Sequence, residues 1–311
     1  MPGWLASGLV YASGLALTSG GITFLYITTR TFNFAHASMA TFGFYVVYTL
    51  VALKGGNPYI YFPLAFLFGS LLGIIVYFIL NRPLLKRKAN EITLMMSTLG
   101  YDLILLSLIQ MYCDYLTHTY KLYPRRVTMS VYDIQIGGMN ASTYFAPITA
   151  VLIITALSLF LTKTKFGIAM RATIENTPLS EASGINSDKI YLTSWIIGGG
   201  MASLGGAVLA MATTGSPVLG MNLIANMFAG AILGGLYSIY GGLFGGFVVG
   251  LAEYAIVYWL AQSLGTWVLG YRLAIPLLIM VVTLLFFPRG LAGIQWKKAF
   301  KSLSSEKGEA S

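Results

Sequence analysis

The feature that most constrains this chain is a run of 63 residues, Ile190–Ala252, that contains no charged side chain. Soluble domains carry about 25% charged residues, whereas 9% of this chain is charged. The run cannot cover a water-facing surface, but it suffices for three passes through a bilayer, each of about 20 apolar residues. The composition therefore predicts a polytopic membrane protein. It excludes a disordered chain, a coiled coil and a nucleic-acid binder built on a basic surface.

The charge-free intervals predict nine membrane spans, with one more or one fewer still open. They are Trp4–Thr28, Phe32–Leu53, Tyr59–Leu80, Ile92–Cys113, Thr143–Thr162, Ile190–Thr214, Asn222–Ile239, Gly242–Gln262 and Leu273–Phe287. The stretch Gly234–Gly246 holds six glycines and is the weakest part of this division. A tight turn, a broken helix and a re-entrant helix all fit it. The sequence predicts an all-α bundle of eight to ten spans, with glycine-rich helices that are broken or closely packed.

The basic residues predict the orientation of these spans. Alternation puts the segments Arg82–Glu91 and Lys163–Lys189 and the C-terminal tail on one side, which holds 14 of the lysines and arginines against five on the other. The basic side of a membrane protein is the cytoplasmic one. We therefore expect a cytoplasmic C-terminus, an external N-terminus if the span count is odd, and a main external surface at Asp114–Ser142.

The polar breaks are too short for a further domain. We expect a single membrane domain over residues 1–293, with an inner loop over 163–189. A basic cytoplasmic tail is expected over 294–311.

Two polar residues near the start of the second span share a predicted helix face, because Asn33 and His36 are three residues apart. Such a face lies against protein or water rather than lipid. A packed histidine, hydrogen-bonded across helices, competes with a role in a translocation path. The other histidine, His118, falls in an external loop, so we expect no metal site.

Two acidic residues lie at or near membrane depth. Asp102 is near the middle of the fourth span, where a carboxylate costs about 2.5–3.5 kcal/mol on insertion scales. A water-filled cavity, a cation or protonation must offset this cost, so both a path-lining acid and a packed neutral acid stay open. Glu253 follows the uncharged run directly, and an interfacial acid at a helix end is its alternative.

The inner loop contains signals for a short helix. Thr177 is a candidate cap, Pro178 suits the first helical position, Glu181 complements the helix dipole and Gly184 ends the helix. A simple connector between spans does not require a helix at Pro178–Ser183. The pattern therefore indicates a docking element for a soluble partner.

No catalytic motif accompanies these features. The sequence has no G-x-x-x-x-G-K-[ST] loop, no H-E-x-x-H and no G-x-S-x-G. It therefore gives no sign of ATP hydrolysis by that route, or of an intramembrane hydrolase, on this chain.

Four blocks of sequence, in order, resemble the membrane permease subunit of branched-chain amino-acid ABC importers, the LivH type. They are Asn33–His36; Phe166–Ala172 with Glu175–Asn176 and Ala182–Asn186; Phe228–Leu236 through Ser238–Ile239 and Gly241–Gly242 to Gly250–Glu253; and Phe287–Leu291. The resemblance covers about Gly20 to Gly293. It departs from the family at Ala37 and Ser38, where glycine and an acidic residue are usual, and also at Tyr237–Tyr240, near Asp102 and at Pro288–Gly290.

The resemblance implies a transport subunit without its own catalytic site or cofactor, in a prokaryotic plasma (inner) membrane. The implied partners are ATP-binding cassette subunits that carry ATP and Mg, a second related permease or a second copy, and an extracytoplasmic solute-binding protein. The inner loop becomes a coupling helix, with contact and shape positions at Arg171, Glu175, Leu179, Glu181, Gly184 and Ile185. The expected translocation path runs along Asn33, His36, Ser38, Ser97, Gly100, Asp102, Gly234, Gly235 and Glu253.

The expected substrates are leucine, isoleucine and valine or similar apolar amino acids, because the path is apolar and poor in charge. Urea and short amides fit the same mechanism. A proton-coupled secondary transporter, with Asp102 and His36 as a relay, is the alternative from another class.

Overall fold

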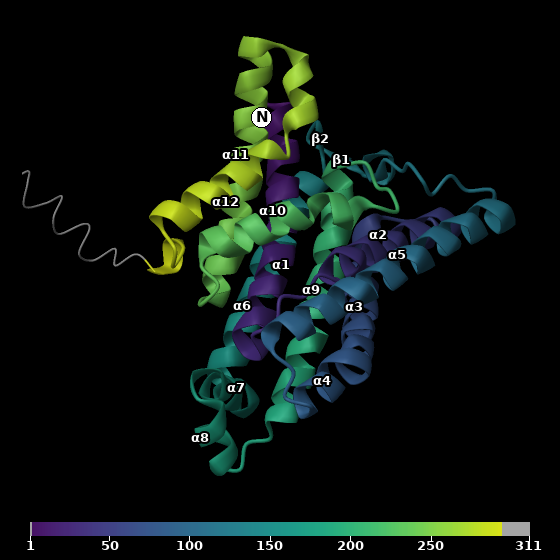
Figure 1. Ribbon diagram of the computed structural model, residues 1–311. Coiled ribbons are helices and arrows are strands. Elements are labelled where there is room, and N and C mark those ends of the chain that lie inside the picture. The colour runs from purple at the N-terminus through teal and green to yellow at the C-terminus, as the bar shows by residue number, and fades with distance from the viewer. Residues whose placement is uncertain (1, 294–311) are drawn as a thin grey trace, which may run out of the picture.

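The computed structural model describes residues 2–293, and the predicted tail over 294–311 lies outside them. The fold is all-helical (Figure 1). Its α-helices are α1 Gly3–Thr29, α2 His36–Lys54, α3 Phe62–Val76, α4 Arg82–Lys86, α5 Glu91–Tyr120, α6 Ser142–Lys163, α7 Lys165–Glu175, α8 Thr177–Ala182, α9 Ser187–Ala212, α10 Leu219–Gly234, α11 Ile239–Leu264 and α12 Ala274–Phe286. Short helical turns are η1 Pro58–Tyr61, η2 Tyr77–Asn81, η3 Met129–Tyr132, η4 Thr266–Tyr271 and η5 Leu291–Gly293, and β1 Gln135–Ile136 pairs with β2 Met139–Asn140.

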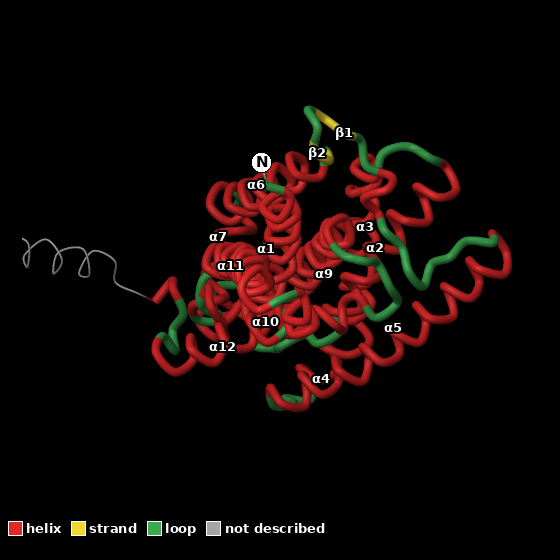
Figure 2. Tube along the Cα trace, turned by 90° about the horizontal axis from the view of Figure 1, so that it is seen from above, coloured by secondary structure: helices red, strands yellow, loops and turns green. Residues whose placement is uncertain are grey.

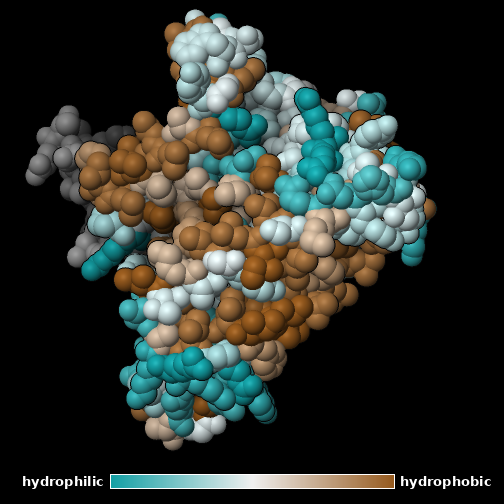
Figure 3. Space-filling model, turned by 45° about the vertical axis from the view of Figure 1, so that its right-hand side comes forward, coloured by the Kyte–Doolittle hydropathy of each residue, from teal (hydrophilic) through white to brown (hydrophobic). Residues whose placement is uncertain are grey.

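Within residues 2–293, eight helical segments are long and apolar enough to cross a membrane. The shorter α10, of 16 residues, adds a ninth apolar element. The prediction of an all-α bundle with eight to ten spans is therefore confirmed. Figure 3 shows a broad hydrophobic surface between hydrophilic regions, one of them at the lower end where α7 and α8 lie.

Two sets of contacts define the ends of the bundle. At the end that carries α7 and α8, here called the loop end, Arg82 Nη2 lies 2.9 Å from Asp188 Oδ2 and joins α4 to the start of α9. At the other end, here called the distal end, the Tyr45 hydroxyl donates to the Pro124 carbonyl oxygen at 2.8 Å. The chain starts at the distal end (Figure 1), so the N-terminus lies opposite the inner loop.

The core forms around α1 and α9. In their most apolar 18-residue windows, 94% of the residues of α1 and 83% of those of α9 are buried, against 22% for α6. Figure 2 shows both helices inside the ring formed by the others. The two most deeply buried helices, α1 and α9, each carry five glycines.

Glycines allow α9 to touch α2 at backbone distance. A methyl group added at Gly43 would lie 1.9 Å from the Ser203 carbonyl oxygen, and one at Gly206 would lie 1.9 Å from the Ala40 carbonyl oxygen. Gly73 of α3 approaches the Trp195 carbonyl oxygen of α9 in the same way. Without a hydrophobic force between helices in lipid, such contacts stabilise the bundle by close packing. The predicted tight packing is present.

The second span begins later than predicted. The helix starts at His36, and Asn33 lies in the preceding non-helical segment, so the two do not share a helix face and that prediction is wrong. The segment is nevertheless buried, with Thr31 1% and Asn33 0% exposed. Irregular backbone at membrane depth is tolerated where protein covers it. His36 Nε2 lies 3.0 Å from the Thr18 carbonyl oxygen, so α2 starts beside the middle of α1.

The glycine-rich stretch resolves into a tight turn. The chain turns between Gly235, with φ of +98°, and Ser238, while Gly241–Gly246 continue inside α11. Positive φ at Gly235 is open to glycine at little cost. The predicted spans Asn222–Ile239 and Gly242–Gln262 therefore had misplaced boundaries: the helices run over Leu219–Gly234 and Ile239–Leu264.

The distal surface is shorter than predicted. Helix α5 continues to Tyr120, so Asp114 belongs to the helix, where it pairs with Arg125 at 2.7 Å. The connection to α6 includes the hairpin β1–β2, whose turn residues Gly137 and Gly138 both have positive φ. The sequence reading had not predicted this hairpin.

Candidate coupling and translocation sites

The inner loop folds into two helices, α7 and α8, beyond the bundle (Figure 1). The sequence reading missed α7. Thr164 caps it by accepting the Gly167 N–H at 2.9 Å. Gly167 also lets the chain fold back on α6, because a methyl group there would lie 2.1 Å from the Phe160 carbonyl oxygen. The T-x-x-G pattern was the available signal for this bend.

The short predicted helix is present, but its cap differs. Helix α8 spans Thr177–Ala182, and Asn176 is the cap, since its Oδ1 accepts the Leu179 N–H at 3.1 Å. The Thr177 hydroxyl instead donates to the Thr173 carbonyl oxygen at 2.9 Å. Asn176 ends α7 and starts α8, which makes it the joint between them.

Gly184 ends α8 as predicted. Its φ is +84°, its N–H donates to the Glu181 carbonyl oxygen at 2.9 Å, and the Ile185 N–H reaches the Ser180 carbonyl oxygen at 3.0 Å. These two bonds form a Schellman motif, which favours glycine at the left-handed position. The turn leads directly into α9, which Asn186 caps at the Lys189 N–H.

The predicted coupling residues gather on this helix pair, and most are open to solvent. Arg171, Glu175, Leu179, Glu181 and Gly184 are exposed, and Ile185 is half-buried. Buried Met170 and Ser180 anchor the pair from beneath. Leu179, an apolar side chain of α8, is 64% exposed. The Ser187 hydroxyl donates to the Glu181 carboxylate.

Asp102 contacts the first turn of α2. Its Oδ1 accepts the Ser38 N–H at 3.1 Å, and the Ser38 hydroxyl reaches the Asp102 carbonyl oxygen at 3.3 Å. The positive end of a helix dipole favours a carboxylate there. This contact stabilises the carboxylate and so offsets part of the cost of inserting Asp102 into the membrane. It was not among the three offsets expected from the sequence. Among the described residues, Asn33 Oδ1 and His36 Nδ1 have no hydrogen-bond partner.

The other expected path residues lie elsewhere. Ser97 donates to the Leu94 carbonyl oxygen at 2.7 Å, and Gly100 is exposed on α5 with nothing within 4 Å of an added methyl group. Gly234 and Gly235 form the turn near the loop end of α10. Of the nine expected path residues, Asn33, His36 and Ser38 lie at or just before the start of α2, where Ser38 contacts Asp102 of α5. Gly234 and Gly235 lie together at the end of α10, and Glu253 lies on α11.

Glu253 is the centre of a buried polar cluster. Its Oε2 accepts the Tyr11 hydroxyl at 2.8 Å and the Asn226 amide at 2.7 Å. Its Oε1 accepts Arg272 Nε at 2.8 Å. The carboxylate side chain is 1% exposed and the Arg272 side chain 33%. A buried charge thus finds a partner and further donors, as stability demands.

Arg272 was not predicted as a site residue. The signal was available, because it is the one basic residue between the last two predicted spans. Its guanidinium lies over the rings of Tyr11 and Tyr254, at 5.3 and 5.5 Å from their centroids. Burial lowers the pKa of this guanidinium, but the attraction of Glu253, the neighbouring Tyr11 and Tyr254 and the hydrogen bond to Glu253 together outweigh burial and raise the pKa above its usual range.

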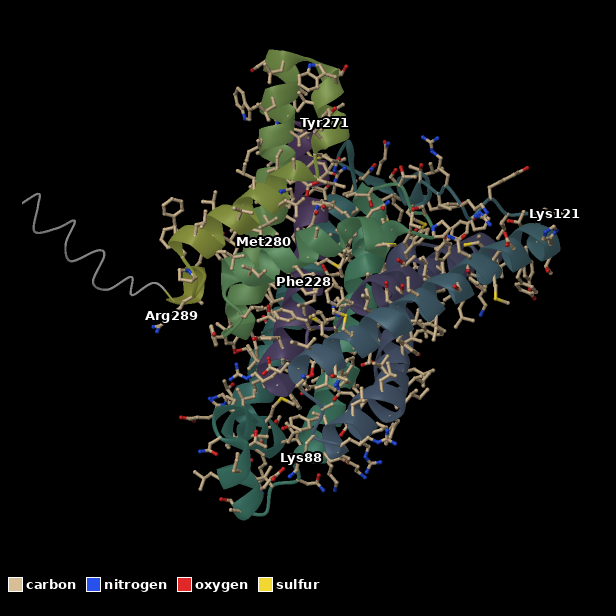
Figure 4. All side chains as sticks on the ribbon, viewed as in Figure 1. Lys88, Lys121, Phe228, Tyr271, Met280 and Arg289 are labelled. Carbon is tan, nitrogen blue, oxygen red and sulfur yellow. The ribbon has the colours of Figure 1, made fainter. Side chains whose placement is uncertain are left out.

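Arg272 and Glu253 border a cavity of about 520 Å³ at the distal end, between α1, α11 and η4. Figure 4 places Tyr271, the last residue of η4, in the upper part of the molecule and Lys88 near the loop end. Within residues 2–293, no group of three or more His, Cys, Asp or Glu residues is placed to hold a metal ion.

Comparisons of sequence and fold relate the chain to known proteins. The family model described as "Branched-chain amino acid transport system / permease component" matches residues 4–284. The chain is 38% identical to a probable branched-chain amino acid transport permease protein LivH from Methanocaldococcus jannaschii, over 97% of this chain and 95% of that protein. It is 25% identical to the high-affinity branched-chain amino acid transport system permease protein LivH of Escherichia coli K12, over 92% and 94%. The solved structure "PsaBC from Streptococcus pneumoniae in complex with Fab" matches with a TM-score of 0.50 and 15% identity, over 93% of this chain and 94% of that one. That last likeness concerns the fold alone.

Proposed function

The chain belongs to the family of branched-chain amino acid transport permeases, non-catalytic membrane components of ABC transport systems, and we propose that it carries leucine, isoleucine and valine into the cell. The hydrolysis of ATP, with Mg, takes place on separate cassette subunits in this proposal. The membrane is the prokaryotic plasma (inner) membrane, with the loop end in the cytoplasm. The excess of basic residues at the loop end supports this orientation.

The observation that carries the proposal is the helix pair α7–α8 at the loop end. It extends beyond the bundle (Figure 1), is anchored by buried Met170 and exposes Leu179. An apolar side chain at such a tip is accounted for by a partner surface that covers it. We propose that α8 seats in an ATP-binding subunit, with contact and shape positions at Arg171, Glu175, Leu179, Glu181, Gly184 and Ile185.

Substitution in α8 tests this coupling. Replacing Glu181 by Ala together with Gly184 by Ala in the assembled transporter should abolish ATP-driven leucine uptake while the permease still folds and inserts. Ile168→Ala, an exposed apolar position on α7, is the matched control and should leave uptake nearly unchanged. Normal uptake in the double variant would overturn the coupling assignment.

The remaining partners follow from the same proposal. A second related permease, or a second copy of this chain, completes the pore, and an extracytoplasmic solute-binding protein delivers the substrate to the distal end. Residues 1–293 form one permease domain in this proposal. The path assignment of Asn33, His36, Ser38, Ser97, Gly100, Asp102, Gly234, Gly235 and Glu253 stays a prediction.

Uptake of labelled leucine separates the competing functions. Chain-dependent uptake that survives collapse of the proton gradient but fails on ATP depletion supports an ABC importer. Uptake lost with the gradient despite ample ATP would point to a proton-coupled carrier. Absence of leucine uptake, with uptake of urea or short amides, would keep the mechanism and change the substrate.

A further inference from the structure

The distal cavity has the size of a small-molecule site. Its volume of about 520 Å³ falls within the range of roughly 300–1,000 Å³ that is typical of ligand pockets. It is bounded by the first turns of α1, the second half of α11 and η4. Those elements come from the two ends of the described chain.

One end of this cavity carries unused hydrogen-bond donors. Arginine has five N–H donors in a planar fork, and in the described residues Arg272 uses Nε on Glu253. Glu253 is already satisfied, since Tyr11, Asn226 and Arg272 all donate to it. Even with a hydrogen bond to Tyr254, N–H donors of the two amino groups of Arg272 remain to bind an acceptor, and a planar carboxylate is the acceptor that matches them.

The polar cluster also holds Arg272 in place. Its Nε is fixed by a carboxylate that is itself held by two donors, and its plane lies over Tyr11 and Tyr254. Asn226 Oδ1, buried in the same cluster, has no partner among the described residues. A guanidinium that is fixed before the ligand arrives loses less entropy on binding.

The remaining walls are apolar and aromatic. They are formed by Trp4, Tyr254, Val257, Tyr258 and Leu269. The rings of Trp4 and Tyr258 stack with centroids 5.1 Å apart. Such walls suit an aliphatic side chain, and aromatic faces attract an ammonium group. The three parts of an aliphatic α-amino acid thus each have a matching surface. Arg272 matches the carboxylate, the aromatic faces match the ammonium group, and the apolar walls match the side chain.

We propose that this cavity is an entry subsite for the aliphatic amino acid, in which Arg272 binds the α-carboxylate and the walls around Val257 hold the side chain. The inference rests on the proposed function and deepens it. It makes Arg272 a specificity-determining residue, because urea and short amides have no carboxylate for it. Among the substrates that the sequence left open, the cavity therefore selects amino acids.

The test is equilibrium binding of labelled leucine to the complete transporter in lipid nanodiscs, without solute-binding protein. Leucine, leucinamide and decanoate serve as competitors, the last to detect a site for lipid-like carboxylates. Leucinamide should compete at least about tenfold more weakly than leucine, because it lacks the charge-assisted contact.

Two variants probe the cavity without leaving a buried charge unpaired. Val257→Trp fills the cavity and should weaken leucine binding about tenfold, whereas Ile256→Trp, on the exposed face of the same helix, should change it less than about twofold. The double variant Glu253→Gln with Arg272→Gln keeps hydrogen-bonding groups in place and should erase the preference for leucine over leucinamide.

Several results would overturn the inference. They are equal competition by leucine and leucinamide in the wild type, equal effects of the two tryptophan variants, stronger competition by decanoate, or no specific leucine binding. Leucine uptake by the full importer in proteoliposomes distinguishes a failure of the subsite proposal from a failure of the proposed function. Uptake that persists alongside any of these results refutes the subsite alone, whereas loss of uptake in the wild type refutes the proposed substrate as well.

Discussion

Gly43 offers a sharp test of the helix packing, because a methyl group there would meet backbone on α9. The added Cβ of Gly43→Ala would lie 1.9 Å from the Ser203 carbonyl oxygen and 2.5 Å from the Ser203 Cα. Cβ atoms do not approach closer than 3.0 Å, so α2 and α9 must separate by about 1.1 Å in a close-packed interior. Neither neighbour is the end of a flexible side chain, so the contact cannot be relieved by a rotamer change.

The expected cost is at the upper end of the range for overpacking, about 3 kcal/mol. A loss of this size lowers the melting temperature by roughly 5 °C, because the entropy of unfolding grows with chain length. Thermal unfolding in detergent, followed by tryptophan fluorescence, measures it. Gly100→Ala is the matched control, since Gly100 is also inside a helix but has open space around it. There, alanine removes the helix penalty of glycine and should stabilise by about 0.5–1 kcal/mol. A melting temperature of Gly43→Ala equal to that of the wild type would refute the packing argument, as would equal losses in both variants.

Three further variants test single contacts. Asn176→Ala should remove the cap of α8, cost about 1 kcal/mol locally and speed amide exchange at Leu179, which hydrogen exchange monitored by mass spectrometry detects; unchanged exchange would contradict the cap. Asp102→Asn should lower stability by about 0.5–1 kcal/mol, because it removes the carboxylate that α5 places beside the first turn of α2, and an unchanged melting temperature would count against that contact. Arg82→Gln should cost less than about 1 kcal/mol, since its pair with Asp188 is partly exposed, and a larger loss in chemical denaturation would show that the pair does more than join two helix ends.

The membrane class, the span count and the short helix α8 were predictable because each leaves a chemical mark. Long uncharged runs mark spans, basic clusters mark one side, and the glycine at Gly184 marks a helix end. The start of α2 was not predictable by the same means. The segment from Thr31 to Ala35 is uncharged. Dividing the chain at its charged residues therefore assigns this segment to the span, although its backbone is not helical.

The site could be predicted less completely, because its partners meet only in three dimensions. Glu253 was found as an isolated acid, but its contacts with Tyr11 and Asn226 join residues more than 200 positions apart or on different helices. Arg272 was counted only as one charge on the external side. The N-terminal cap of α8 was misassigned, since Asn176 and Thr177 are both acceptable capping residues and only the backbone geometry decides between them.

The short link between α8 and α9 gives the molecule a mechanical property. Only Ser183–Asn186 separate the exposed tip of α8 from the first turn of α9. Helix α9 in turn contacts α2 and α3 through glycines, and these contacts leave no room for a methyl group between the backbones. A displacement of α8 is therefore transmitted through this short link to α9, in the centre of the bundle. Under the proposed function, a small stroke at a cytoplasmic partner would tilt three packed helices together.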